Sequence, residues 1–94
     1  MKYEVKKVDN CFSDAQSYEY KVPIICAEMI KRMTDWEITE NHKYRRPMFV
    51  GERDGSHSKG ILKANVFRVS FRNDRWEQEK ADFELWIEQQ SDEV

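Results

Sequence analysis

An almost strictly alternating stretch, VFRVSFR at residues 66–72, constrains the fold of this chain more than any other feature. Apolar side chains occupy every second position from Phe67 onward, and two arginines and a serine lie between them. Successive side chains of a strand point to opposite faces, so this pattern predicts a strand with one buried face. The alternation continues less regularly back to Ile61, and we therefore expect a long central strand over residues 61–72.

A helix over residues 75–90 is expected to follow this strand. Asp74 is placed to accept hydrogen bonds from the free N–H groups of the first turn, and Glu77 completes a capping-box spacing. Leu85 lies nearly opposite Trp76 on the helix, either as an isolated surface leucine or as a contact for a partner. The other large apolar side chains share about one third of the helix circumference: Trp76, Phe83, Trp86 and Ile87.

The N-terminal part of the chain predicts a hairpin and a helix. Alternation over residues 2–8 and 17–22 indicates two antiparallel strands, so residues 1–22 form the first hairpin. Pro23 suits the first position of a helix, where its missing N–H is no loss. Apolar residues then recur at spacings of three and four, which predicts a helix over residues 23–37.

The middle of the chain predicts a second hairpin. Residues 39–47 are polar and are expected to connect the first helix to a strand over residues 48–53. The glycine-bounded segment at residues 54–60 is predicted to be a loop that returns the chain to the central strand. The second hairpin would therefore cover residues 48–72.

These elements follow one another in the order ββαββα. With 94 residues, the chain is long enough for one modest core, so residues 1–94 are expected to form a single domain. We predict an α+β fold, a two-layer sandwich in which two helices cover one face of a four-stranded, mainly antiparallel sheet. Aromatic residues make up 13% of the chain and leucines number two, so aromatic rings are expected to fill much of the core.

The sequence predicts a protein of the cytoplasm that does not enter a membrane. No run of apolar residues approaches the ~20 needed to cross a bilayer, and the first residues lack the apolar segment of a signal peptide. Cys11 and Cys26 are expected to be free thiols, as is usual in a reducing compartment, with a disulfide between them as the alternative. Such a compact domain would suit an accessory protein of a bacterium or a phage.

Charge is distributed very unevenly along the chain. Residues 1–42 carry six Lys/Arg and eight Asp/Glu, a net charge of −2. Residues 43–75 carry nine and three, a net of +6, whereas residues 76–94 carry one and seven, a net of −6. The total of −2 therefore hides a strong charge asymmetry. The acidic helix could imitate a row of phosphates, although the balanced total argues against a general DNA mimic.

The basic segment coincides with the second hairpin and defines a candidate binding surface. Arginines and aromatic rings on an open sheet can contact a nucleic-acid backbone and stack its bases, or they can bind an acidic protein surface. Alternatively, these charges only keep the exposed sheet face soluble. The candidate residues are Tyr44, Arg45, Arg46, Phe49, Arg53, Arg68 and Arg72.

The sequence contains no clear catalytic or cofactor motif. Its three glycines form no phosphate-binding loop. Two cysteines and two histidines are spaced about fifteen residues apart, whereas zinc ligands usually come in close pairs. His57, in the polar loop, is a weak candidate for a general base. We therefore predict no cofactor, no metal ligand and no catalytic residue, and an enzyme is not expected.

Two functional hypotheses remain. The first is a small, non-enzymatic protein-binding or regulatory module that acts on a larger protein partner or self-associates, with Leu85 as a candidate partner contact. The alternative is a nucleic-acid-binding domain that uses the basic hairpin, with affinity that falls steeply with salt.

Overall fold

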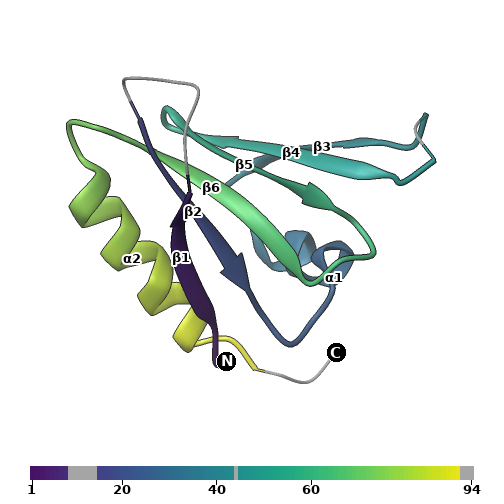
Figure 1. The fold of residues 1–94 in the computed structure, drawn as a ribbon, viewed down its shortest axis with the longest axis horizontal. Coiled ribbons are helices and arrows are strands. Elements are labelled where there is room, and N and C mark those ends of the chain that lie inside the picture. The colour runs from purple at the N-terminus through teal and green to yellow at the C-terminus, as the bar shows by residue number, and fades with distance from the viewer. Residues whose placement is uncertain (9–14, 44, 92–94) are drawn as a thin grey trace.

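The fold was analysed in a computed structural model, which describes residues 1–8, 15–43 and 45–91 (Figure 1). The chain belongs to the α+β class, as expected from its sequence. The elements are β1 (Glu4–Val8), β2 (Ala15–Lys21), α1 (Cys26–Arg32), β3 (Glu37–Asn41), β4 (Met48–Arg53), β5 (Ser56–Ile61), β6 (Val66–Arg72) and α2 (Trp76–Glu88).

All six strands belong to one antiparallel sheet with the order β1-β2-β6-β5-β4-β3. The prediction of a four-stranded sheet is therefore wrong. The additional strands are β3 and β5, and the expected long strand over residues 61–72 is divided by a turn into the end of β5 and the whole of β6. The predicted first hairpin is present as β1 and β2, and β2 pairs along its whole length with β6.

The segment predicted to be a loop over residues 54–60 is mostly strand β5. Only Asp54 and Gly55 form the turn from β4, and both have positive φ angles, of 49° and 88°. Two-residue turns with positive φ match the twist of a hairpin, and Asp-Gly is a favoured pair for them. The β4–β5 hairpin is therefore tighter than the sequence pattern indicated.

Helix α1 is shorter than the predicted helix over residues 23–37, and its start is fixed by the sheet. The backbone N–H groups of Cys26 and Ala27 donate to the carbonyls of Ala64 and Leu62, at 2.7 and 2.9 Å. These carbonyls lie in the turn between β5 and β6, so the free N–H groups of the first helical turn find partners in the neighbouring hairpin. A side-chain cap is not used at this end.

The chain leaves α1 at Met33, where ψ is 61°. Trp36 lies three residues after Met33 and is buried. The edge strand β3 begins at Glu37, directly after Trp36. Residues 39–41 of the predicted polar connection over residues 39–47 therefore belong to a strand that pairs with β4.

Helix α2 begins close to the predicted position, but Asp74 does not cap it. The structure has Arg75 at the cap position without a side-chain cap hydrogen bond. Asp74 instead accepts a hydrogen bond from Nη2 of Arg72, at 2.8 Å. The carboxylate thus ties the end of β6 to the following turn.

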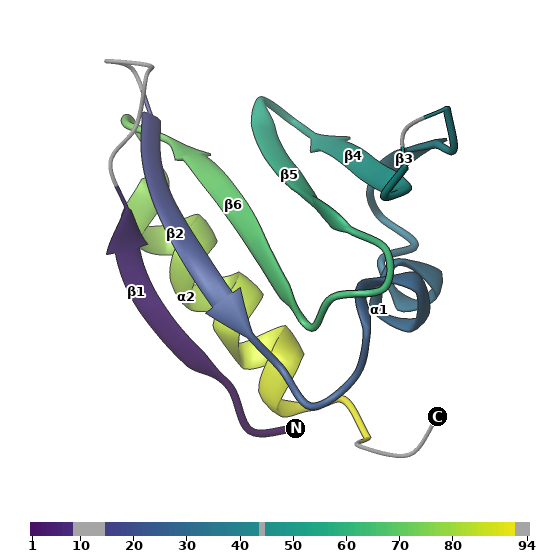
Figure 2. The ribbon, with the colours of Figure 1, turned by 45° about the vertical axis from the view of Figure 1, so that its right-hand side comes forward.

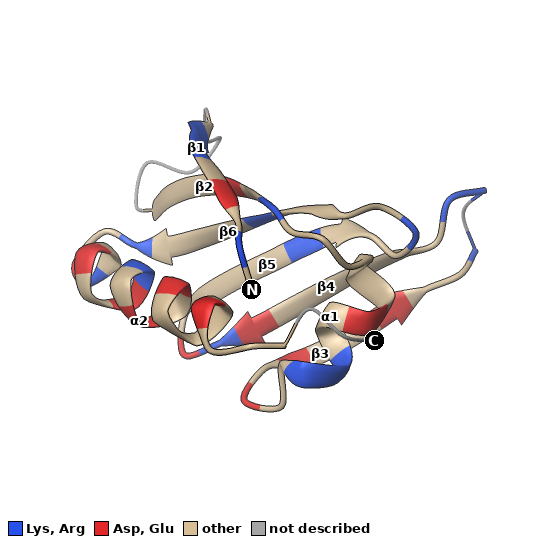
Figure 3. Ribbon diagram, turned by 90° about the horizontal axis from the view of Figure 1, so that it is seen from below, with Lys and Arg blue, Asp and Glu red and all other residues tan. Residues whose placement is uncertain are grey.

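Both helices lie on the same side of the sheet, which leaves two layers (Figure 3). Helix α2 lies behind β1, β2 and β6, whereas α1 lies near β4 and β5 (Figure 2). Phe83 is 1% exposed and is central to the core, because its ring contacts those of Tyr20, Phe67 and Phe71. The buried apolar residues are Tyr18, Tyr20, Val22, Ile24, Cys26, Met29, Met33, Trp36, Phe49, Leu62, Phe67, Val69, Phe71, Phe83 and Ile87.

Gly60 allows β5 to pass close to the helix layer. A Cβ atom at this position would lie 3.0 Å from both Phe49 and Phe67, and 3.3 Å from Sγ of Cys26. A side chain larger than hydrogen would push these buried groups apart. Strand β5 therefore has glycine at this inward position, where the buried neighbours leave no room for a side chain.

Candidate interaction surface

The face of the sheet opposite the helices is open, since no described helix lies against it (Figure 3). Cross-strand partners in register point to the same face, so the strand pairings define rows of neighbouring side chains on this open face. The central row, from β1 to β3, consists of Lys6, Glu19, Arg68, Lys59, Val50 and Thr39.

Glu19 forms ion pairs with two cations of this row and compensates one of their two charges. Its carboxylate lies 3.1 Å from Nζ of Lys6 and 3.9 Å from Nε of Arg68. Lys59, on the far side of Arg68, is exposed and has no ion pair with a described residue. The central row is therefore of mixed charge rather than a continuous basic stripe.

An apolar strip crosses the open face and meets the central row at Val50. We define it as Met48, Val50, Ile61 and Val66, which come from β4, β5 and β6. Met48 and Ile61 are cross-strand partners. Ile61 and Val66 lie next to the cross-strand pair Gly60–Phe67, one residue closer to the β5–β6 turn. Val50 is 46% exposed and the other three are half-buried. This strip is where the open face presents apolar surface to solvent.

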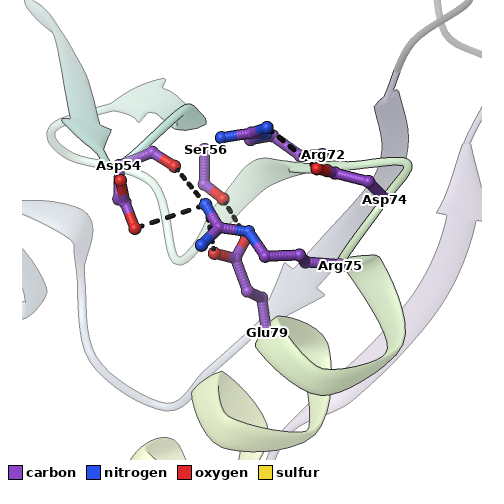
Figure 4. Close-up of polar contacts among 6 residues, drawn as sticks. All are labelled: Asp54, Ser56, Arg72, Asp74, Arg75 and Glu79. Carbon is purple, nitrogen blue, oxygen red and sulfur yellow. Dashed lines mark hydrogen bonds and ion pairs between the residues drawn. The ribbon is translucent and has the colours of Figure 1, made fainter.

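Arginines at one end of the sheet are held in a compact polar cluster, which we call the turn clamp (Figure 4). Nη2 of Arg75 lies 2.9 Å from the Asp54 carbonyl and 3.2 Å from its carboxylate. Glu79 accepts a hydrogen bond of 2.6 Å from the buried Ser56 hydroxyl and lies 3.4 Å from Arg75. The clamp joins the β4–β5 turn to the first turn of α2. Its residues are Asp54, Ser56, Arg72, Asp74, Arg75 and Glu79.

The opposite end of the sheet carries exposed cations without ion-pair partners among the described residues. They come from the end of β2, the β5–β6 turn and the connection between β3 and β4. Acidic residues near this end include Glu4, opposite Lys21 in register, and Glu40, which lies 3.3 Å from His42. Glu28 of α1 follows Ala27, which is hydrogen-bonded to the β5–β6 turn, and its carboxylate pairs with Lys31 at 3.2 Å. We call this group the basic end and define it as Lys21, Lys43, Arg45, Arg46 and Lys63.

The residues predicted to form one binding surface are distributed over different parts of the structure. Phe49 is buried in the core, and Arg53 lies on the helix side, with its guanidinium 4.8 Å from the ring centre of Trp36. Arg68 lies on the open face, and Arg72 belongs to the turn clamp. The placement of Phe49 and Arg53 differs from the expected shared face with Arg68.

The remaining predicted residues fall near the β3–β4 connection. Arg45 and Arg46 are exposed and belong to the basic end, whereas Tyr44 lies outside the described residues. Sequence reasoning did not include Lys21 in the surface, because its place beside the β5–β6 turn depends on the pairing of β2 with β6. Lys63 was counted in the basic segment, but the alternation pattern predicted a strand at this position. The structure places Lys63 in the turn between β5 and β6.

Leu85 lies on the outer side of α2, where it is 54% exposed. Asp82 and Glu88, three residues before and after it, are also exposed, so an apolar side chain is set in acidic surroundings. This position is on the helix layer, away from the apolar strip on the open face.

A shallow hollow of about 310 Å³ lies at the β1–β2–β6 side of the sheet. Charged side chains of both signs, those of Glu4, Lys6, Glu19 and Lys21, contribute to its walls. The two histidines are exposed: His57 lies 3.7 Å from Glu52 on the open face. Within the described ranges, no three His, Cys, Asp or Glu residues are grouped closely enough to hold a metal ion.

Burial governs the ionisation of two core side chains. Burial raises the pKa of the Cys26 thiol to about 11, against an ordinary value of 9.0. Burial also raises the pKa of Tyr20, and Glu84 adds to this effect. Cys26 is a free thiol, and its Sγ lies 3.4 Å from the Val66 carbonyl. Both groups remain protonated at neutral pH.

The raised Cys26 pKa predicts a loss of stability at alkaline pH. Above pH 9 the unfolded chain loses the thiol proton while the folded chain keeps it, so deprotonation favours unfolding. Between pH 9 and pH 10 the free energy of unfolding should fall by about 1 kcal/mol from this group. Urea unfolding of a Cys11→Ser variant measures the fall, and Cys26→Ala in the same background should reduce it. An equal fall in both variants would contradict this assignment.

Among the described residues, no helix is both long and apolar enough to cross a membrane. Comparison with known proteins gave no match to a family model, to a curated protein or to a solved structure.

Proposed function

We propose that this chain is a small, non-enzymatic protein-binding module that docks on a larger partner through the open face of its sheet. One observation carries the proposal: the helices cover a single face, and the other face presents the apolar strip with Val50 half-exposed at its edge. An apolar surface framed by charged residues is a common composition for the centre of a protein interface.

The open face is large enough for a specific interface. Six strands spaced about 4.8 Å apart give a width of roughly 24 Å, and strands of about six residues give a length of roughly 20 Å. Projecting side chains increase the accessible area beyond this flat outline. The face is thus comparable with the roughly 800 Å² that each partner buries in a standard complex.

Lys59 and Arg68 indicate the charge of the partner surface. Lys59 is the cross-strand partner of Val50, and Arg68 is the next residue along the central row. Lys59 has no carboxylate partner among the described residues. A partner with apolar side chains at its centre and carboxylates around them would match this arrangement. The charges would mainly increase the association rate and orient the complex, while apolar burial would supply most of the affinity.

A benzophenone side chain placed at position 50 tests the docking surface, with a second probe at position 25 as the control. Ile25 is 42% exposed and precedes α1 on the helix side, so it matches Val50 in size and exposure. On irradiation in lysate of the source cells, position 50 should crosslink to one protein and position 25 should not. The crosslinked protein is then purified for binding measurements.

Val50→Asp is expected to weaken binding of that protein at least tenfold, a change of about 1.4 kcal/mol. Ile25→Asp should leave the affinity unchanged, and circular dichroism should show both variants folded. Leu85→Asp tests the outer side of α2 as a contact in the same measurement. If Val50→Asp bound as tightly as the unmodified chain, the open face would not be the docking surface. A loss with Leu85→Asp alone would transfer the contact to α2.

A further inference from the structure

The structure distinguishes paired from unpaired cations at the two ends of the sheet, which the charge count along the sequence cannot do. Near the β4–β5 turn, Arg72 and Arg75 form ion pairs in the turn clamp, and Arg53 packs on Trp36. At the opposite end of the same strands, the five cations of the basic end have no ion pair with any described residue. Lys59 in the central row is also unpaired among the described residues, but the basic end is the largest group of such unpaired cations that come from neighbouring connections.

Backbone hydrogen bonds hold the connections of the basic end side by side. The Val22 N–H donates to the Asn65 carbonyl at 3.0 Å, and the Leu62 N–H donates to the Pro47 carbonyl at 2.9 Å. Lys21 immediately precedes Val22, and Lys63 immediately follows Leu62. Lys21 and Lys63 are thus each next in sequence to a residue whose backbone N–H bonds to a neighbouring connection.

The basic end follows the order of the strands. Lys21 ends β2, Lys63 lies between β5 and β6, Arg46 and Arg45 precede β4, and Lys43 follows β3. From β2 to β3 there are four strand spacings, so the row is roughly 19 Å long. Figure 1 shows these connections in succession from the end of β2 to the β3–β4 connection.

We infer that the basic end binds the phosphate backbone of a nucleic-acid duplex. A row of roughly 19 Å is longer than the ~12 Å width of the B-DNA major groove, so its two ends can reach phosphates of both strands. Lysine and arginine side chains that project from backbone-anchored turns position a protein on phosphates without reading the base sequence.

A duplex fits this surface better than a single strand. Non-specific single-strand binding uses exposed aromatic rings on which bases stack. Every aromatic side chain in the described ranges is buried or half-buried, and the open face presents aliphatic rather than aromatic side chains. The basic end therefore offers charge for the backbone without a described stacking platform.

Fluorescence anisotropy with a labelled 20-base-pair DNA duplex tests this inference. Five phosphate contacts predict a slope of log affinity against log salt of about −4.5, which is a loss of roughly 500-fold between 50 and 200 mM NaCl. Scrambling the duplex sequence should leave the affinity unchanged, because backbone contacts carry no sequence information. A single strand of the same length should bind more weakly.

A triple variant, Lys21→Gln, Arg46→Gln and Lys63→Gln, should lower the affinity at least tenfold and reduce the slope by about three. Lys31→Gln is the control for the loss of one charge outside the basic end, because Lys31 is exposed on α1 and pairs with Glu28. This control should bind like the unmodified chain. If the control lost as much affinity per charge removed as the triple variant, total charge rather than the basic end would govern binding.

The result can be separated from the docking proposal by Val50→Asp, which leaves the basic end intact and should retain duplex affinity. Absence of binding at 50 mM NaCl, or binding that is independent of salt, would overturn the inference. Preferential binding of the single strand would overturn the duplex assignment. A third outcome is also informative: the unmodified chain does not bind the duplex, and the triple variant no longer binds the crosslinked protein. That result would overturn the inference and assign the basic end to an acidic protein surface.

Discussion

Replacing Phe83 with alanine is expected to lower the free energy of unfolding by about 3–5 kcal/mol. Phe83 is 1% exposed, and its ring centre lies 5.2 to 6.1 Å from five other aromatic rings. Removing the ring loses its transfer free energy and leaves a cavity between rings that cannot all move inward. The five neighbours are Tyr20, Trp36, Phe67, Phe71 and Trp86.

Urea unfolding followed by tryptophan fluorescence measures this loss. Domains of this size unfold with roughly 5–15 kcal/mol, so the variant should lose a large part of its stability. The melting temperature should fall by roughly 15–30 °C. Leu85→Ala on the same helix is the control, because Leu85 is exposed and should change stability by less than about 0.5 kcal/mol. A loss below 1 kcal/mol for Phe83→Ala would contradict the packing of α2 on β6.

Replacing Glu79 with alanine is the second large effect, with an expected loss of about 2–3 kcal/mol. The Glu79 carboxylate accepts a 2.6 Å hydrogen bond from the Ser56 hydroxyl, and Ser56 is fully buried. Without the carboxylate the buried hydroxyl has no acceptor from α2, and Arg75 keeps only its contacts with Asp54. The contribution of the Arg75 ion pair itself is small because the guanidinium is partly exposed.

Chemical unfolding of Glu79→Ala, Glu79→Gln and Glu77→Ala separates these contributions. The glutamine keeps an acceptor for Ser56 and should recover most of the loss. Glu77 is exposed in the same helical turn, so its replacement should cost less than about 1 kcal/mol. If Glu79→Ala and Glu77→Ala were equally destabilising, the clamp would add nothing beyond the general charge of the turn.

The sequence predicted the elements whose apolar spacing is set by burial. Alternation over residues 66–72 identified β6, because Phe67, Val69 and Phe71 all face the core. Spacing of aromatic and aliphatic side chains likewise identified α2. In both elements the buried positions carry large apolar side chains, so the period is visible without knowledge of the neighbours.

Strands β3 and β5 could not be recognised in this way. The inward positions of β5 are Ser56, Ser58 and Gly60, none of which shows an apolar period. Gly60 lies against Phe49 and Phe67, and Ser56 donates a hydrogen bond to Glu79 of α2. Strand β3 lies at the sheet edge and is mostly polar, with Ile38 half-buried. Both strands are defined by pairing with β4 rather than by their own apolar pattern.

Because β5 was not recognised as a strand, Phe49 and Arg53 were assigned to the wrong face of the sheet. With β5 inserted, Phe49 pairs with Gly60, and Gly60 pairs with Phe67, so Phe49 shares the buried face of Phe67. Side chains alternate between the two faces along a strand, so a shift of one residue in register would exchange the faces. Arg53 is four residues after Phe49 on β4 and therefore points to the same helix side. Charge counting correctly located the basic segment, but it could not distinguish the arginines of the clamp from the cations of the basic end.

The strand order has a consequence for the kinetics of folding. Strands β3 to β6 follow one another as a meander, so their pairings form between segments close in the chain. Strand β2 instead pairs with β6 across sequence separations of 45 to 57 residues, from Lys21–Val66 to Ala15–Arg72. Such long-range closure costs chain entropy before it is rewarded by contacts, and it slows folding. On the ribosome, the aromatic face of β2 would remain uncovered until β6 and α2 have been synthesised, which makes this hairpin the segment most in need of protection from aggregation.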